Sequence, residues 1–420
     1  MLDRTVAPAI NRIEQVTIPE AKKVAFDNGL SLFYINAGQQ PVVRLEVVFK
    51  AGKWFESIPG QSYFTGKMLT EGTKSFTAKE IAGLFDAYGA FVEVVPGFDR
   101  VTLTLHLLTR HLPSILPVLR EVVTEPSFQQ KELDTIKTRK KQQLLVDLEK
   151  NSFVAAQRFT ENIFGINHPY GRLLSQSNIE AIERQSVIDF FQKQFSGNYE
   201  VIMCGAIGEN ELELVNKYLG QTPKRTANDI QVTFQPYEAT KVFKEKEDSL
   251  QSSVRLGMPF INRSHKDYLE MIVVNEILGG YFGSRLMRNI RENKGYTYGI
   301  RSVISCLDQA SFWTVSTDVK KQFWKQTLEE ISYEIGVLRN QQVPKEELET
   351  VKNYMLGTFV SSIDTPFALA DKFKTIHYSG LDYRYYQQYF KTIKEIDQDR
   401  ILELSQEYLR EEAMTTVVIG

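Results

Sequence analysis

Hydrophobic residues along the first half of the chain follow two different spacings, one typical of strands and one typical of amphipathic helices. Alternating or short apolar runs predict strands at residues 23–26, 30–36, 42–52, 91–95, 99–107 and 199–207. Helical spacing predicts helices over residues 60–69 and 77–88, and further helices that begin at His111, Gln129 and Ser152. This mixture of antiparallel strands and helices favours an α+β fold over repeated right-handed βαβ units.

The second half of the chain repeats the pattern of the first. The tripeptide Val43-Arg44-Leu45 recurs 211 residues later, and the helical segment 132–137 recurs 215 residues later as 347–352. The apolar strands that end at Gly205 and Gly420 are also 215 residues apart. Like segments in the same order and at a nearly constant offset predict a duplicated domain, in which an antiparallel sheet packs against helices.

A polar segment with prolines separates the two repeats. Residues 221–241 lack the apolar spacing of a helix or strand and are interpreted as a linker. The predicted organisation is therefore an N-terminal α/β domain at 1–220, the linker at 221–241, and a C-terminal α/β domain at 242–420. A length of 420 residues also favours more than one domain.

Composition narrows the classes of function. A net charge of −2 gives no overall attraction to nucleic acid, and no run approaches the roughly 18 apolar residues of a membrane span. The first residues carry no apolar export signal, so we expect a cytoplasmic protein, or a periplasmic one if a signal peptide has been removed. Two cysteines cannot form a disulfide framework, and the five histidines lack the spacing of a self-contained zinc site.

The predicted helix at 60–69 carries the first informative motif. Its sequence is Gly60-Gln-Ser-Tyr63-Phe-Thr-Gly66-Lys67-Met-Leu-Thr-Glu-Gly-Thr73. This frame resembles the pitrilysin/insulinase-type zinc metallopeptidases, in which the helix bears an inverted His-x-x-Glu-His motif. The flanking residues match that pattern, but Tyr63, Gly66 and Lys67 stand where the family has histidine, glutamate and histidine.

These replacements remove the chemistry of a metal site. Positions 63, 66 and 67 share one helical face, where two imidazoles and a carboxylate could hold a divalent cation and its water. A lysine ammonium instead places positive charge there, and a glycine supplies no base. The resemblance implies a third ligand, a glutamate near Gln143, and no carboxylate stands at that position. The chain is therefore expected to bind no cofactor of its own.

A second motif of the same family is intact. Residues 278–286 form a glycine-rich turn that ends in Ser-Arg-Leu, and residues 287–299 read MRNIRENKGYTYG. The resemblance implies that Arg291 and Tyr298 bind a substrate carbonyl and stabilise the tetrahedral intermediate at a metal held elsewhere. A guanidinium and a phenol are suitable donors for a developing oxyanion. Gly295 is predicted to end the preceding helix in a left-handed conformation.

Three further features carry weaker signals. Glu93 occupies a place on a predicted edge strand where active relatives have asparagine, which argues against substrate pairing along that strand. The loop 167–172 is interpreted as a proline turn that packs an aromatic ring. Tyr378 and the aromatic run 383–390 have helical spacing and are interpreted as core or interface residues.

One degenerate and one intact motif together indicate a division of labour. The resemblance implies the fold shared by LuxS and mitochondrial processing peptidase metallohydrolases, with two duplicated α/β domains. It further implies a non-catalytic, substrate-binding subunit of a heterodimeric zinc metallopeptidase, inactive alone. Its partner would be a homologous His-x-x-Glu-His subunit that holds the zinc, its substrate a peptide, and neither nucleic acid nor membrane a partner. The alternatives are a scaffold or homodimer without a role in proteolysis, and an independent enzyme that uses unrecognised residues.

Overall fold

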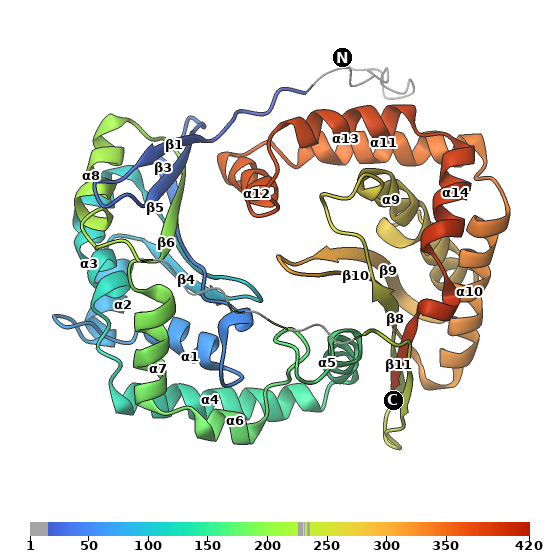
Figure 1. Ribbon diagram of the computed structural model, residues 1–420, viewed down its shortest axis with the longest axis horizontal. Helices are drawn as coiled ribbons and strands as arrows, with labels where there is room; N and C mark the ends of the chain where they lie inside the picture. The colour runs from blue at the N-terminus through green and yellow to red at the C-terminus, as the bar shows by residue number, and fades with distance from the viewer. Residues whose placement is uncertain (1–15, 226–229, 231, 233–235) are drawn as a thin grey trace, which may run out of the picture.

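Two similar halves lie side by side in the computed structural model, which describes residues 16–225, 230, 232 and 236–420. Figure 1 shows the N-terminal half on the left and the C-terminal half on the right, with each sheet toward the middle and most helices toward the outside. Both halves are built from one sheet and a layer of helices, which confirms the predicted α+β class. The domain boundaries themselves stay a prediction.

The N-terminal half contains a six-stranded sheet. In spatial order its strands are β1 (Lys22–Ala25), β2 (Ser31–Asn36), β6 (Tyr199–Gly205), β3 (Val42–Phe49), β5 (Val101–Leu108) and β4 (Phe91–Pro96). Its helices are η1 (Lys53–Phe55), α1 (Gln61–Met68), α2 (Ala78–Ala87), η2 (Thr109–His111), α3 (Leu112–Thr124), α4 (Gln130–Leu148), α5 (Asn151–Phe164), α6 (Gln176–Ala181), α7 (Arg184–Phe190), η3 (Phe191–Phe195) and α8 (Glu209–Leu219). The sequence analysis located every one of these strands but missed α6, α7 and α8.

The C-terminal half contains a five-stranded sheet. In spatial order its strands are β7 (Lys241–Lys244), β11 (Thr415–Ile419), β8 (Gln251–Pro259), β10 (Ser311–Lys320) and β9 (Thr297–Cys306). Its helices are α9 (Tyr268–Asn275), η4 (Glu276–Gly280), η5 (Met287–Asn293), η6 (Lys321–Phe323), α10 (Trp324–Asn340), α11 (Lys345–Ser361), α12 (Pro366–His377), α13 (Arg384–Glu395), α14 (Gln398–Tyr408) and η7 (Glu411–Ala413). Strand β7 begins at Lys241, the last residue of the predicted linker, and part of that linker lies outside the described residues.

The two sheets share one arrangement, as the sequence repeat predicts. Strand β3 lies between β6 and β5, and β8 lies in the same way between β11 and β10. In each sheet the last strand of the half pairs antiparallel with the strand that carries Val-Arg-Leu. Each sheet is otherwise antiparallel except for one pair, β2 with β6 and β7 with β11, which run parallel. The predicted antiparallel sheets therefore each contain one parallel pair.

Each half donates one helix to the other, an exchange that the sequence analysis did not foresee. Helix α5 of the first half packs on β8 and β11, and α12 of the second half packs on β2 and β6. In Figure 1, α12 and α5 bridge the two halves at the top and bottom of the view. Phe159 of α5 packs with Val417, and Phe373 of α12 lies 5.0 Å from Phe33 between ring centroids. Neither half completes its apolar packing without the other.

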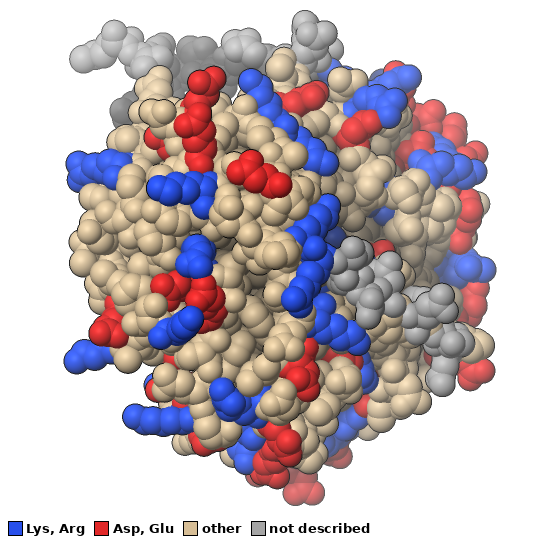
Figure 2. All heavy atoms as spheres, turned by 60° about the vertical axis from the view of Figure 1, so that its left-hand side comes forward, with Lys and Arg blue, Asp and Glu red and all other residues tan. Residues whose placement is uncertain are grey.

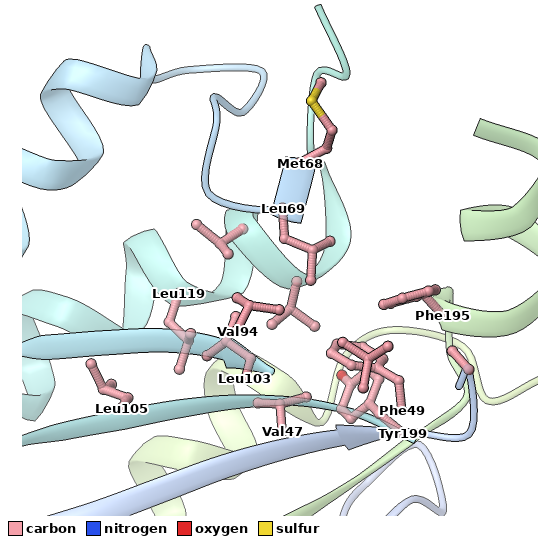
Figure 3. Packing of buried hydrophobic residues seen from close by; sticks show 14 of the residues in the cluster. Val47, Phe49, Met68, Leu69, Val94, Leu103, Leu105, Leu119, Phe195 and Tyr199 are labelled. Atoms are coloured by element: carbon pink, nitrogen blue, oxygen red, sulfur yellow. The ribbon is translucent and has the colours of Figure 1, made fainter. Parts of the chain in front are cut away.

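Helix α1 is anchored in the core of the N-terminal half. Phe64 and Met68 on this helix are fully buried, and so are Val47 on β3 and Leu103 on β5. Figure 3 shows these strands below α1 and α3, with Leu69, Val94 and Phe49 filling the space between the layers. Burial of these side chains fixes the position of α1 against β4 and β5, and therefore the geometry of the first motif.

Charged residues are mixed on the surface of this half. In Figure 2, Lys and Arg side chains alternate with Asp and Glu over the visible face, without a broad region of one sign. Among the described residues, no helix is both long and apolar enough to cross a membrane.

A buried ionic cluster fastens α12 to the first sheet. Arg44 and Glu46 on β3 are 7% and 4% exposed, although both are charged. The Arg44 guanidinium donates to Asp371 Oδ1 at 2.9 Å and to the Phe367 carbonyl at 2.9 Å. Lys374 donates to Glu46 Oε1 at 2.7 Å. Since α12 supplies Phe367, Asp371 and Lys374, this cluster holds the exchanged helix by polar as well as apolar contacts.

Replacing Arg44 with methionine should lower the free energy of unfolding by about 2–3 kcal/mol, because Glu46 would keep only Lys374 as a counter-ion at a buried site. The measurement is urea denaturation of wild type and variant. Arg384→Met is the matched control, because Arg384 pairs with Asp382 where both side chains are exposed, and should change stability by less than about 0.5 kcal/mol. Equal effects of the two variants would contradict a stabilising role for the cluster.

Candidate functional site

Helix α1 follows a glycine in the left-handed conformation, after which the chain enters the core. Gly60 has φ of 98°, a conformation that side-chain-bearing residues avoid, and it directly precedes α1. The Ser62 amide donates to Glu56 Oε1 at 3.0 Å, so a carboxylate satisfies one free amide of the first turn. Helix α4 packs against α1, and Lys140 of α4 lies over the ring of Tyr63.

Tyr63 lies where the family has its first zinc-binding histidine. Its side chain is half-buried, and the Lys140 ammonium of α4 lies 4.5 Å from the centroid of its ring. Burial raises the pKa of the Tyr63 phenol, so it stays neutral. Burial also lowers the pKa of Lys140, and the charge of nearby Lys67 acts in the same direction. A cation therefore occupies the space beside the first ligand position.

Gly66 lies where the family has its catalytic glutamate. It is buried against the sheet, and a Cβ atom built there would stand 3.0 Å from Val101 Cγ1 and 3.4 Å from Val94 Cγ1. The approach to Val101 is tighter than most Cβ contacts in proteins, and the approach to Val94 lies at the lower edge of ordinary van der Waals contact. Valines of β4 and β5 fill the space that a longer side chain would need.

Lys67 lies where the family has its second histidine. Its ammonium donates to the carbonyl of Val94 at 2.5 Å and so ties α1 to strand β4. This contact gives Lys67 a structural role, because it supplies a hydrogen-bond partner to a partly buried backbone carbonyl of the edge strand.

Gln143, at the position of the third ligand, is exposed on α4. It donates a hydrogen bond that helps to lower the pKa of Asp147 one turn later. No group of three or more His, Cys, Asp or Glu side chains within the described ranges could hold a metal ion. With a tyrosine, a packed glycine, a lysine and an uncharged amide, the residues at these four positions do not fit a zinc ion.

Arg291 and Tyr298 lie close together in the chain, on η5 and at the start of β9. Gly295 between them has φ of 67°, which confirms the predicted left-handed end of the helix. The Arg291 guanidinium lies 4.4 Å from the centroid of the Phe282 ring, and Tyr298 is 93% exposed. Within the described part of the chain, neither side chain makes a hydrogen bond or an ion pair. Both polar groups are therefore available to a ligand.

A hollow of about 510 Å³ lies near this pair, although neither Arg291 nor Tyr298 lines it. Phe282, which contacts Arg291, and Gly299, which follows Tyr298, both line it. Arg255, Arg301 and Asp318 contribute its charged groups. The glycine-rich turn and β9 thus form a concave polar surface next to Arg291 and Tyr298.

The weaker sequence features have structural roles. Tyr170 in the loop 167–172 is fully buried, and its hydroxyl donates to Asp99, which confirms a turn that packs an aromatic ring. Tyr386 is buried against Phe359, so the aromatic run belongs to the core. Glu93 is exposed on β4, and β4 lies at the edge of its sheet as predicted.

The sequence analysis missed a pocket beside α1. Its charged residues come from η1, the segment after it, α4 and the loop after α5: Lys53, Glu56, Lys140, Asp147 and Arg172. No motif links these residues, because they are brought together only by the packing of α4 on α1.

Comparisons with known proteins agree with the two motifs. Residues 32–174 match the family described as Insulinase (Peptidase family M16), and residues 181–355 match its Peptidase M16 inactive domain. The chain therefore belongs to peptidase family M16. It does so without the His-x-x-Glu-His zinc motif.

Similar curated proteins have contrasting descriptions. "Uncharacterized zinc protease YmxG" of Bacillus subtilis is 23% identical, covering 82% of this chain and 85% of that protein. "Non-peptidase homolog YmxG" of Helicobacter pylori is 26% identical, covering 71% of this chain and 70% of that protein.

Solved structures share the whole fold. A peptidase M16 inactive domain from Pseudomonas fluorescens superimposes with a TM-score of 0.86 and 21% identity, covering 95% of this chain and 98% of that one. A protease from Helicobacter pylori gives a TM-score of 0.85 and 17% identity, covering 96% and 100%. These likenesses establish the M16 fold for both halves.

Proposed function

We propose that this chain is the non-catalytic, substrate-binding subunit of a heterodimeric zinc metallopeptidase. Its partner is a homologous chain with an intact His-x-x-Glu-His motif, which holds the zinc and activates the water. This chain supplies Arg291 and Tyr298 to the partner's active site, where they bind the scissile carbonyl and stabilise the oxyanion.

The observation that carries the proposal is the contrast between the two motifs. At the zinc positions, Tyr63 and Lys67 have contacts within their own half, and Gly66 is packed against valines. In the other half, the guanidinium of Arg291 and the hydroxyl of Tyr298 have no polar partner among the described residues. Because Tyr298 is 93% exposed and Arg291 has no ion pair among the described residues, neither donor would have to give up a polar partner of its own chain to bind a substrate.

The test is to express the chain alone and together with a His-x-x-Glu-His subunit. Bound zinc and cleavage of a mixed set of quenched peptides are measured for the chain, the partner and the pair. The pair should cleave at least about tenfold faster than the partner alone, since donors to an oxyanion contribute this much or more. The chain alone should neither hold zinc nor cleave.

Two results would contradict the proposal. Zinc-dependent cleavage by the chain alone would mean that its own residues form an active site. A pair that assembles but is no faster than the partner alone would favour the scaffold alternative.

A further inference from the structure

A pocket of about 400 Å³ lies beside the degenerate zinc positions. It is formed by α1, the end of β4, α4, α5 and the loop at 172–174. Its wall is partly apolar, with lining residues that include Pro59, Tyr63, Pro96, Phe98, Leu144, Phe153 and Leu174. A volume of this size suits a short group such as one or two residues of a peptide.

Three cations line this pocket with few internal partners. Lys53 donates one hydrogen bond, to the Tyr170 carbonyl at 3.1 Å, although an ammonium has three donors. Arg172 donates to the Glu56 carbonyl at 2.8 Å, and its buried Nε has no hydrogen-bond partner among the described residues. Lys140 lies over the Tyr63 ring. Several charged donors are thus left unused in a half-enclosed space.

The two acidic groups of the pocket offset these three cations only in part: Glu56 acts on Lys53 and Arg172, and Asp147 acts on Lys140. Glu56 is 6% exposed and accepts a hydrogen bond from the Ser62 amide of α1. Burial raises the pKa of Glu56 to about 7, so a large share of it is uncharged at neutral pH. Asp147 forms an ion pair with Lys150 at 2.7 Å. Burial lowers the pKa of Lys53 to about 8, and the charge of Arg172 acts in the same direction, against the opposing charge of Glu56.

We propose that this pocket binds the C-terminal carboxylate of a peptide, with the last side chain of the peptide against the apolar wall. The carboxylate would accept hydrogen bonds from Lys53, Lys140 and Arg172, which line the pocket. Arginine and lysine donors to a carboxylate are the strong, charge-assisted kind. That the ligand is a peptide rests on the proposed function.

The charge of the lining supports a carboxylate over an amine. Three cations line the pocket, Lys53, Lys140 and Arg172, against two acidic groups, Glu56 and Asp147. A carboxylate is attracted to this excess of positive charge, whereas the ammonium group at the other end of a peptide would add a further cation.

The test uses the chain alone, without a partner. Two fluorescein-labelled decapeptides of one mixed sequence ending in Leu, one a C-terminal acid and the other a C-terminal amide, are titrated by fluorescence anisotropy. The acid should bind about tenfold more tightly than the amide, as one charge-assisted contact in a shielded site predicts. Lys140→Gln should reduce this preference at least threefold.

Lys141→Gln is the matched control, because Lys141 is the next residue of the same helix and pairs with Glu180 at 2.5 Å. It should keep the full preference for the acid. Thermal unfolding shows whether each variant is folded. The ratio of the two binding affinities, for the acid and for the amide, is measured on the wild type and tests the proposal even if a variant fails to fold. Equal binding of acid and amide, or equal effects of both lysine variants, would overturn the proposal.

This outcome is independent of the test of the proposed function. Tighter binding of the acid, together with a heterodimer that is no faster than the partner alone, would support the proposed pocket and reject the proposed role of this chain in catalysis. Added turnover without any preference for the acid would keep that role and reject the pocket.

Discussion

Replacing Arg291 with glutamine and Tyr298 with phenylalanine should lower the turnover of the reconstituted pair by about 10²-fold or more, while the zinc content stays the same. The expected loss is large because both donors act where negative charge develops, so their removal affects the transition state more than the ground state. The zinc is unaffected because its ligands lie in the partner. The measurements are turnover of quenched peptides and metal analysis of the purified pair.

The matched control is the double variant Arg288→Gln and Tyr296→Phe. Arg288 lies one turn before Arg291 on η5, and the ring of Tyr296 stacks on Phe323 at 4.4 Å between centroids. Neither is predicted to reach the substrate, so turnover should stay within about twofold of wild type. An undiminished rate for the Arg291 and Tyr298 variant, in a pair that assembles normally, would reject their assigned role.

The second large effect concerns Gly66. Replacing it with glutamate, as a first step in rebuilding the zinc motif, should lower the free energy of unfolding by about 3 kcal/mol. The new side chain would begin 3.0 Å from Val101 and would place a carboxylate against the buried faces of β4 and β5. The gain in helix propensity, about 1 kcal/mol, is too small to offset this cost. Urea denaturation measures the difference.

Gly83→Glu is the control for Gly66→Glu. Gly83 is exposed on α2, and nothing lies within 4 Å of a Cβ atom built there. The same substitution should therefore leave stability unchanged or raise it by up to about 1 kcal/mol through helix propensity. If both variants were equally stable, position 66 would have room for a glutamate side chain, and the packing argument at Gly66 would be wrong.

Part of the candidate site could be predicted from local sequence. Gly295 takes the left-handed conformation that ends a helix. A glycine between a helical and a β-rich segment predicts this, because glycine adopts that conformation without steric cost. The loss of the zinc ligands at Tyr63, Gly66 and Lys67 is also a property of the sequence, since no fold gives these residues the chemistry of histidine and glutamate. The resemblance at 287–299 then indicated Arg291 and Tyr298.

Other features depend on residues that are distant in the chain. The cation beside Tyr63 is Lys140, which reaches it only because α4 packs on α1. Arg44 and Glu46 read as ordinary polar positions of a strand, and they are buried because α12 of the other half covers them. No local sequence pattern predicts such contacts. The spacing of apolar residues shows which residues share one face of a helix or strand, but not which other element covers that face.

The sequence by itself determined the α+β class, the internal duplication and the absence of the zinc motif. These follow from the spacing of apolar residues, from the repeat within the chain and from the identity of single residues, all of which can be read without knowing the tertiary structure. Only the tertiary structure decided the exchange of α5 and α12, the packing that closes the space at Gly66, and the pocket of Lys53, Lys140 and Arg172. Each depends on long-range burial of side chains, which is fixed when the sheets and helices pack and not when they form.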